Sequence, residues 1–195
     1  MMDEKSLINQ DRSIIVACDV LEVEQYEKIV RETHTHPVIG GYKIGFSLAL
    51  KYGLPAIVEL TRSYTNKPII YDHQKAGTDI PYTGKLFMAV MREAGIDSVI
   101  LFPLTGPKTL EEWIKAAHAN DLHVIVGGLM THHQFLSNEG CYICEGDKGV
   151  YAIYKQAAEL GIKDFVVPGN KPGEVKKIRN LLSAYVSEQC FILQA

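Results

Sequence analysis

The chain has little of several features that would assign it to a specialised class of protein. It contains only 4 cysteines in 195 residues, too few for a disulfide scaffold of this length. No apolar run approaches the roughly 20 residues that a membrane-spanning helix needs. The N-terminal segment MMDEKSLINQDRS is polar where a signal peptide would be apolar. We therefore expect a cytoplasmic protein with no membrane partner, in which the cysteines are thiols.

A large excess of charge of one sign is also lacking. Lys and Arg number 20 against 23 Asp and Glu, which gives a formal net charge of −3. Such a balance provides no overall basic field to hold a nucleic acid, so we expect no nucleic-acid partner. Hydrophobic residues make up 47% of the chain, and no low-complexity or linker-like stretch divides it. We expect residues 1–195 to form a single domain.

Short apolar runs rich in β-branched residues recur along the chain, separated by longer segments with helical spacing. This alternation is typical of parallel strands that are covered by helices. The expected strands are Ser13–Cys18, Gly41–Gly45, Pro68–Tyr71, Ser98–Phe102, His123–Val126, Asp164–Val167 and Cys190–Leu193. The expected helices are Glu22–Glu32, Leu48–Arg62, Thr83–Ala94, Thr109–Ala119, Gly149–Leu160 and Glu174–Tyr185. The pattern predicts an α/β protein.

Two parallel architectures are compatible with this pattern, an open doubly wound sheet and an eight-stranded barrel. The glycine-rich phosphate loop that would favour the open sheet is absent after the first strand, which runs directly into Asp19. Polar residues instead gather at the ends of several strands, as in a barrel with its active site at that end. We predict a TIM (β/α)8-type barrel in which seven of eight strands are identifiable and the last βα unit is missing. Residues 1–195 would then be a C-terminally incomplete barrel domain, with an exposed sheet edge at its seventh strand.

A cluster of charges follows the third expected strand, in the segment IYDHQKAGTDIPYT. It contains Asp72, Lys75 and Asp79. Strand side chains alternate between two faces, so Asp72 and Lys75 would face opposite sides if the strand continued through both. Lys75 is therefore expected beyond the strand end. The alternative is that Asp79 caps the next helix and the other two charges are solvated.

Lys43 lies within the apolar strand GYKIG. A lysine in a strand covered by helices is costly to bury unless it reaches a polar cavity or a carboxylate. Asp72, one strand further along, is the expected partner. The alternative is a lysine that extends out of the barrel rim into solvent.

These segments together resemble the orotidine 5'-monophosphate decarboxylase family. ACD ending at Asp19, YKIG around Lys43, the cluster of Asp72, Lys75 and Asp79, then LMTHH and VVPGNKP follow the family's order and approximate spacing. The resemblance implies an eight-stranded barrel that uses no metal and no organic cofactor. It also implies a nucleotide substrate, with conversion of orotidine monophosphate to uridine monophosphate in de novo pyrimidine biosynthesis.

The resemblance implies a role for each residue of the charged cluster. Asp19 and Lys43 would hold the ribose hydroxyls, and Lys43 would also orient Asp72. Asp72 would lie beside the substrate carboxylate. Lys75 would protonate C6 of the pyrimidine as carbon dioxide leaves, which suits an ammonium group because it supplies both a positive charge and a proton.

The resemblance also implies a homodimer with shared active sites. Asp79 would act in the neighbouring subunit's site, and Ile80 and Thr83 would reach across the same interface. Thr131 occupies the position where the family commonly has a serine that contacts the pyrimidine.

The chain departs from the common family pattern in two places. The usual DxKxxD spacing is DxxKxxxD here, which lengthens both intervals by one residue. The sequence also stops at FILQA, where the family continues into a glycine-rich loop and an arginine that grip the phosphate. If the chain ends at Ala195, we expect poor phosphate binding and little catalysis, because remote binding energy orders the site around the reacting atoms.

Two other functions remain as alternatives. A Mg-dependent sugar-phosphate decarboxylase or aldolase of the same barrel type would need an acidic ligand at the end of the second strand, where Lys43 lies. An inactive barrel-like binding subunit is the second alternative. The single CxxC formed by Cys141 and Cys144 is a weak zinc signal, and we expect no metal site.

Overall fold

The computed structural model describes residues 7–74, 78–142, 146–187 and 190–194. Its framework is one parallel sheet in which each strand pairs with the next along the chain. The strands are β1 (Ile14–Cys18), β2 (Ile39–Gly45), β3 (Ile69–Asp72), β4 (Ser98–Leu101), β5 (His123–Gly127), β6 (Asp164–Pro168) and β7 (Cys190–Gln194). Every one of these pairings is parallel.

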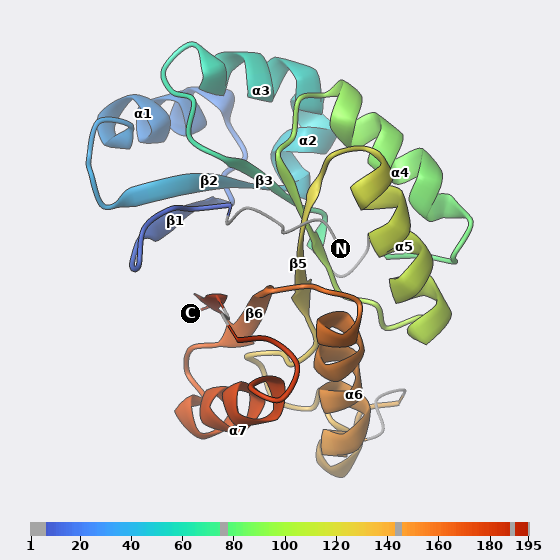
Figure 1. Ribbon diagram of the computed structural model, residues 1–195. Coiled ribbons are helices and arrows are strands. Elements are labelled where there is room, and N and C mark those ends of the chain that lie inside the picture. The colour runs from blue at the N-terminus through green and yellow to red at the C-terminus, as the bar shows by residue number, and fades with distance from the viewer. Residues whose placement is uncertain (1–6, 75–77, 143–145, 188–189, 195) are drawn as a thin grey trace.

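Helices connect the strands and lie on the outer, convex face of the curled sheet (Figure 1). They are α1 (Val23–Thr33), α2 (Phe46–Tyr52), α3 (Leu54–Arg62), α4 (Thr83–Glu93), α5 (Pro107–Ala119), α6 (Gly146–Glu159) and α7 (Pro172–Leu182). Proline in the first turn of α3, α5 and α7 supplies a suitable φ where its missing N–H costs nothing. The fold prediction is confirmed: seven strands alternate with helices and curl into part of a TIM-type barrel.

One predicted helix is wrong. The segment Leu48–Arg62 was expected to form a single helix, but α2 and α3 meet at a break. Gly53 lies between them with a φ of +80°, a backbone conformation that glycine adopts far more readily than other residues. Pro55 follows in the first turn of α3 and cannot continue the hydrogen bonding of α2.

The sheet does not close within the described part of the chain, where β1 and β7 are its two edges. Ile14 on β1 is 53% exposed and Leu193 on β7 is 62% exposed. The prediction of an exposed edge at the seventh strand is therefore confirmed. That residues 1–195 form a single domain stays a prediction.

Two apolar layers hold the sheet in its curved shape. The larger one lies between the sheet and the helices and includes Tyr42, Ile44 and Trp113. The smaller one fills the concave side and consists of Ile70, Ile100, Phe102, Ile125 and Val166. Alternation along the strands produces both layers, because successive side chains point to opposite faces.

A glycine at the end of β5 makes room for the inner layer. A Cβ atom placed on Gly127 would lie 2.2 Å from the ring of Phe102, far inside van der Waals contact. Phe102 itself is only 2% exposed. The side chain of Phe102 therefore fills the space that any larger residue at position 127 would need.

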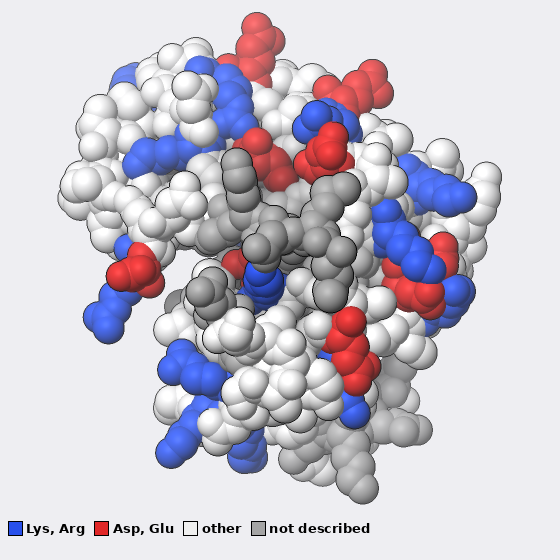
Figure 2. All heavy atoms as spheres, viewed as in Figure 1, with Lys and Arg blue, Asp and Glu red and all other residues white. Residues whose placement is uncertain are grey.

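No described helix is long and apolar enough to cross a membrane. Basic and acidic side chains both occur around the rim of the face seen in Figure 2, in line with the formal net charge of −3. The expected absence of a nucleic-acid partner stays a prediction.

Candidate active site

The register of the first three strands brings three predicted site residues to one end of the sheet. Cys18 pairs with Ile44 between β1 and β2, and Gly45 pairs with Asp72 between β2 and β3. Asp19 follows β1 directly, so its side chain lies at the same carboxyl edge as Asp72. In parallel α/β folds this edge is where ligands bind.

Lys43 projects from β2 toward the concave side of the sheet. Its neighbours Tyr42 and Ile44 are fully buried in the outer layer between sheet and helices. Strand alternation then turns Lys43 to the opposite face. Its side chain is only 17% exposed, so its ammonium group needs compensating charge.

Two carboxylates provide that charge. Lys43 Nζ lies 3.1 Å from Asp72 Oδ2 and 3.2 Å from Asp19 Oδ2. The side chain of Asp72 is 7% exposed, whereas that of Asp19 is 46% exposed. The predicted contact between Lys43 and Asp72 is confirmed, and extension of Lys43 into solvent is not observed.

The absence of a side chain at Gly45 gives Asp19 its place beside Lys43. A Cβ atom on Gly45 would lie 2.3 Å from Asp19 Oδ1. Glycine at position 45, the last residue of YKIG, therefore leaves room for the Asp19 carboxylate next to the ammonium group of Lys43.

The balance of burial and charge keeps Lys43 protonated. Burial by itself lowers the pKa of Lys43, but the charges of Asp72 and Asp19 and the hydrogen bonds to both oppose it, and the net pKa is raised above its ordinary value. The ammonium form is therefore stable at neutral pH. Beside it, burial first and Asp19 second raise the pKa of the Cys18 thiol to about 12, so this cysteine is not a thiolate nucleophile.

The second oxygen of Asp72 is held by the backbone. The N–H of Gln74 donates a hydrogen bond of 2.8 Å to Asp72 Oδ1, while Oδ2 faces Lys43. Gln74 has a φ of +54°, in the left-handed region that few residues other than glycine adopt. Both oxygens of the Asp72 carboxylate are thus fixed before any ligand binds.

Lys75, the predicted proton donor, lies outside the described residues. The strand that precedes it ends at Asp72, as expected if Lys75 is to follow the strand end.

The residues predicted to act across a subunit interface lie on the outer rim, beyond the β3 end. The carbonyl of Asp79 accepts a hydrogen bond of 2.8 Å from Thr105. The carbonyl of Ile80 accepts one of 3.0 Å from the indole of Trp113 and one of 2.9 Å from Thr83. These bonds fix the backbone that leads into α4. The carboxylate of Asp79 is therefore presented from a well-anchored segment.

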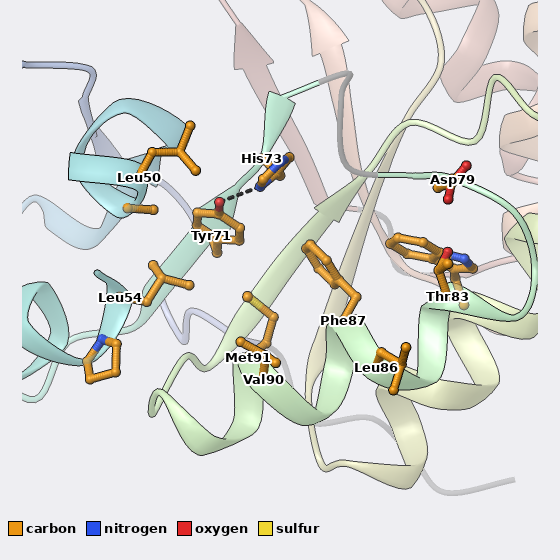
Figure 3. A pocket seen from close by; sticks show the side chains of 13 residues that line it. Leu50, Leu54, Tyr71, His73, Asp79, Thr83, Leu86, Phe87, Val90 and Met91 are labelled. Atoms are coloured by element: carbon orange, nitrogen blue, oxygen red, sulfur yellow. Dashed lines mark hydrogen bonds between the residues drawn. The ribbon is translucent and has the colours of Figure 1, made fainter. Parts of the chain in front are cut away.

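Asp79 and Thr83 also border an apolar groove of about 570 Å³ (Figure 3). Side chains from α2, α3 and α4 line it. Three of these are large apolar side chains that are exposed to solvent: Leu50 at 74%, Leu86 at 61% and Val90 at 54%. The groove lies on the helical side of the molecule, away from the Lys43 ammonium group. A surface of this kind is typical of an interaction site.

Thr131 lies in the loop after β5, and the next βα turn holds that loop. The Asn170 amide donates to the carbonyl of Thr131 at 3.3 Å, and Lys171 Nζ donates to the carbonyl of Met130 at 3.0 Å. The sequence alone does not reveal these two contacts, because the residues that make them are about forty positions apart. Gln74 was missed for a related reason: its importance lies in its backbone and not in its side chain.

The arrangement places one ammonium group between two carboxylates at the mouth of the barrel. A divalent cation bound by Asp19 and Asp72 would have to occupy the position that Lys43 Nζ already holds. Among the described residues, no group of three or more His, Cys, Asp or Glu side chains has a geometry suited to a metal ion. The described part of the site instead offers a carboxylate and an ammonium group that can hydrogen-bond to the hydroxyl groups of a ligand.

The chain is similar in sequence to known proteins. The sequence model of the Orotidine 5'-phosphate decarboxylase / HUMPS family matches residues 12–188. Orotidine 5'-phosphate decarboxylase of Methanosarcina mazei is 32% identical over 178 residues, which cover 90% of this chain and 73% of that protein. The Methanosarcina barkeri enzyme is 33% identical over 172 residues, 87% of this chain and 70% of that protein.

Solved structures share the fold. Orotidine 5'-monophosphate decarboxylase of Methanocaldococcus jannaschii, complexed with the inhibitor BMP, superposes with a TM-score of 0.74 at 22% identity, over 88% of this chain and 74% of that one. A second structure of that protein gives a TM-score of 0.75 at 20% identity, over 94% and 88% of the two chains. Together with the match over residues 12–188, these similarities show that the chain belongs to the orotidine 5'-phosphate decarboxylase / HUMPS family.

Proposed function

We propose that the chain is an orotidine 5'-monophosphate decarboxylase that works without metal or organic cofactor. The observation that carries the proposal is the placement of Lys43 Nζ within 3.2 Å of both Asp19 and Asp72 at the carboxyl ends of β1, β2 and β3. A cytoplasmic location and a role in pyrimidine biosynthesis are part of the proposal.

In the proposed complex, the ribose hydroxyls of the nucleotide contact Asp19 and Lys43. Asp19 is the more exposed carboxylate of the pair, so it is accessible to a sugar. Asp72 lies deeper and its two oxygens are already bonded to Lys43 and Gln74. The substrate carboxylate binds beside it, and Thr131 contacts the pyrimidine.

In the proposed reaction, the bond between C6 and the carboxylate breaks and carbon dioxide leaves. The electron pair stays on C6, and Lys75 donates a proton to it, which yields uridine monophosphate and a neutral amine that solvent reprotonates. The electron pair left on C6 lies in the plane of the ring, where the π system cannot absorb its charge, so a cation placed beforehand lowers the barrier. The Lys43 ammonium and the fixed Asp72 carboxylate supply the preorganised ionic surroundings.

The alternative is a Mg-dependent sugar-phosphate decarboxylase or aldolase of the same barrel type. Against it stands the Lys43 ammonium, which lies where a cation bound by both carboxylates would have to be. A positive side chain cannot ligate magnesium.

Release of carbon dioxide from orotidine monophosphate tests the proposal. We expect any turnover of the nucleotide by the purified chain, even if slow, to have the same rate with and without a chelator, because Lys43 supplies the charge that a metal would otherwise bring. Product should be measured as labelled carbon dioxide together with uridine monophosphate. Loss of activity in the chelator, restored by added magnesium, would favour the sugar-phosphate alternative, and absence of both turnover and uridine monophosphate binding would reject the nucleotide reaction.

We also propose a homodimer in which Asp79, Ile80 and Thr83 of one subunit complete the site of the other. The apolar groove beside Asp79 and the exposed Leu50, Leu86 and Val90 support it. Burial of such side chains is the main driving force of subunit association.

Mixed dimers test this arrangement. Lys75→Ala and Asp79→Asn are each expected to be nearly inactive alone. In a dimer that contains one subunit of each kind, one site would carry both changes and the other neither. Random mixing should therefore restore about a quarter of the wild-type activity, because half of the two-fold dimers are mixed and each has one intact site.

Sedimentation should show that the mixed sample is dimeric. No recovery on mixing, with dimers present, would place Asp79 in the site of its own subunit. A monomeric wild-type protein would reject the shared site altogether.

A further inference from the structure

The side chains of β3 alternate between the two faces of the sheet, and this alternation continues for one residue beyond the strand end at Asp72. Ile70 lies in the inner apolar layer, and Asp72 faces Lys43 on the same side. Tyr71 belongs to the outer layer. His73 follows it outward, where its ring meets the ring of Phe87 at 6.0 Å in an edge-on arrangement.

Contacts with the outer layer hold His73 in place. Its Nδ1 shares a hydrogen bond with the hydroxyl of Tyr71. Burial raises the pKa of Tyr71 to about 12, with a smaller contribution from Asp72, and burial lowers the pKa of His73 despite the opposing charge of Asp72. At neutral pH the phenol is therefore the donor and the uncharged imidazole the acceptor. The backbone up to residue 73 is fixed to the barrel wall.

The chain changes direction at Gln74. By simple alternation this residue would point inward, but its φ of +54° breaks the pattern. The same turn aims its N–H at Asp72 Oδ1. Residues held in this sparsely populated conformation are found where surrounding structure demands it, commonly at functional sites.

The length of the motif explains why a turn is needed here. In a DxKxxD motif, the aspartate and lysine are two residues apart and share one face of an extended strand. In DxxKxxxD they are three apart, and an extended chain would put them on opposite faces. A left-handed residue between them interrupts the alternation.

We propose that Gln74 is a positioning residue for the decarboxylation: its left-handed backbone accommodates the extra residue in the first interval of DxxKxxxD and holds the Asp72 carboxylate. This inference rests on the proposed function. It assigns the role to the backbone at position 74, so the side chain itself is replaceable by any residue that tolerates a positive φ.

Substitutions that differ in backbone tolerance test the proposal. Gln74→Gly removes the side chain but adopts positive φ freely, whereas Gln74→Val opposes it. We expect Gln74→Gly to keep kcat within about threefold of wild type, and Gln74→Val to lower it by at least about tenfold with little change in KM, since misplacement of a catalytic group by about 1 Å can cost about 100-fold.

Asp121 offers a matched control. It is also a non-glycine residue in the left-handed region, with a φ of +52°, but it precedes β5 and lies at the opposite end of the barrel from the site. Asp121→Val introduces the same backbone conflict and should lower Tm without changing kcat. Equal kcat values for Gln74→Val and Gln74→Gly, or an equal fall in kcat for Gln74→Val and Asp121→Val, would overturn the positioning role.

Hydrogen exchange at the amide of residue 74 separates this inference from the proposed function. The bond to Asp72 Oδ1 should slow exchange in the wild type and in Gln74→Gly, and the protection should be lost in Gln74→Val. If the wild type releases no carbon dioxide but shows this protection pattern, the proposed decarboxylase function is rejected and the hydrogen bond from Gln74 to Asp72 is retained. Fast exchange in an active wild type would refute the assignment of Gln74.

Discussion

Lys43→Met is expected to lower the free energy of unfolding by about 3 kcal/mol, because it leaves the Asp72 carboxylate without its charged partner in a largely buried position. The loss should be measured by urea denaturation. Activity should disappear as well, since both the proposed ribose contact and the orientation of Asp72 depend on the ammonium group. A second variant that also carries Asp72→Asn should regain part of the stability but none of the activity.

Lys115→Met is the matched control for that experiment. Lys115 also lies between two carboxylates, those of Glu111 and Glu112, but its side chain is 58% exposed on α5. Surface ion pairs contribute little because solvent screens them. Lys115→Met should therefore unfold at nearly the wild-type urea concentration. Equal losses in the two methionine variants would mean that burial of the Lys43 network does not determine its strength.

Lys75→Ala is expected to reduce kcat for orotidine monophosphate by about 1,000-fold or more, because in the proposed reaction it removes both the proton donor and a cation beside the developing charge. Binding of uridine monophosphate should change by only a few fold, since the product has no carboxylate to interact with Lys75. Titration calorimetry and single-turnover release of carbon dioxide measure the two quantities separately.

Lys75→Arg distinguishes charge from proton transfer. An arginine keeps the positive charge but is a poor proton donor, because its pKa lies above about 12. If positive charge alone were sufficient, this variant would recover most of the activity, and the proposed proton donor would be wrong. Near wild-type turnover in Lys75→Ala would exclude both roles at once.

Reaction and assembly are linked in this interpretation. Lys43, Asp19 and Asp72 are gathered within one subunit by strand register, whereas Asp79 and Thr83 border a groove on the helical side. The segment between them is anchored at one end by His73 and Gln74 and at the other by Thr105 and Trp113. In the proposed homodimer, a second copy packed in the groove would contact residues 79–83, whose backbone these bonds already hold.

The strands of this barrel could be predicted because their signal is local. Apolar β-branched runs such as SVILF and DFVV reflect burial on both faces of a strand, and each run is contiguous in sequence. The prediction of one helix over Leu48–Arg62 was wrong because the segment contains two helices that meet at Gly53. The apolar periodicity continues across this break, and only the backbone angle of Gly53 reveals it.

Lys43 is the clearest case in which the sequence alone determined part of the site. A lysine inside an apolar strand is costly to bury unless it reaches a polar cavity or a carboxylate, and Asp72 was the expected partner. Only the tertiary structure decided how Gln74 turns and how Asn170 and Lys171 hold the loop of Thr131. These features depend on backbone angles and on contacts between distant segments, and neither is recorded in the identity of neighbouring residues.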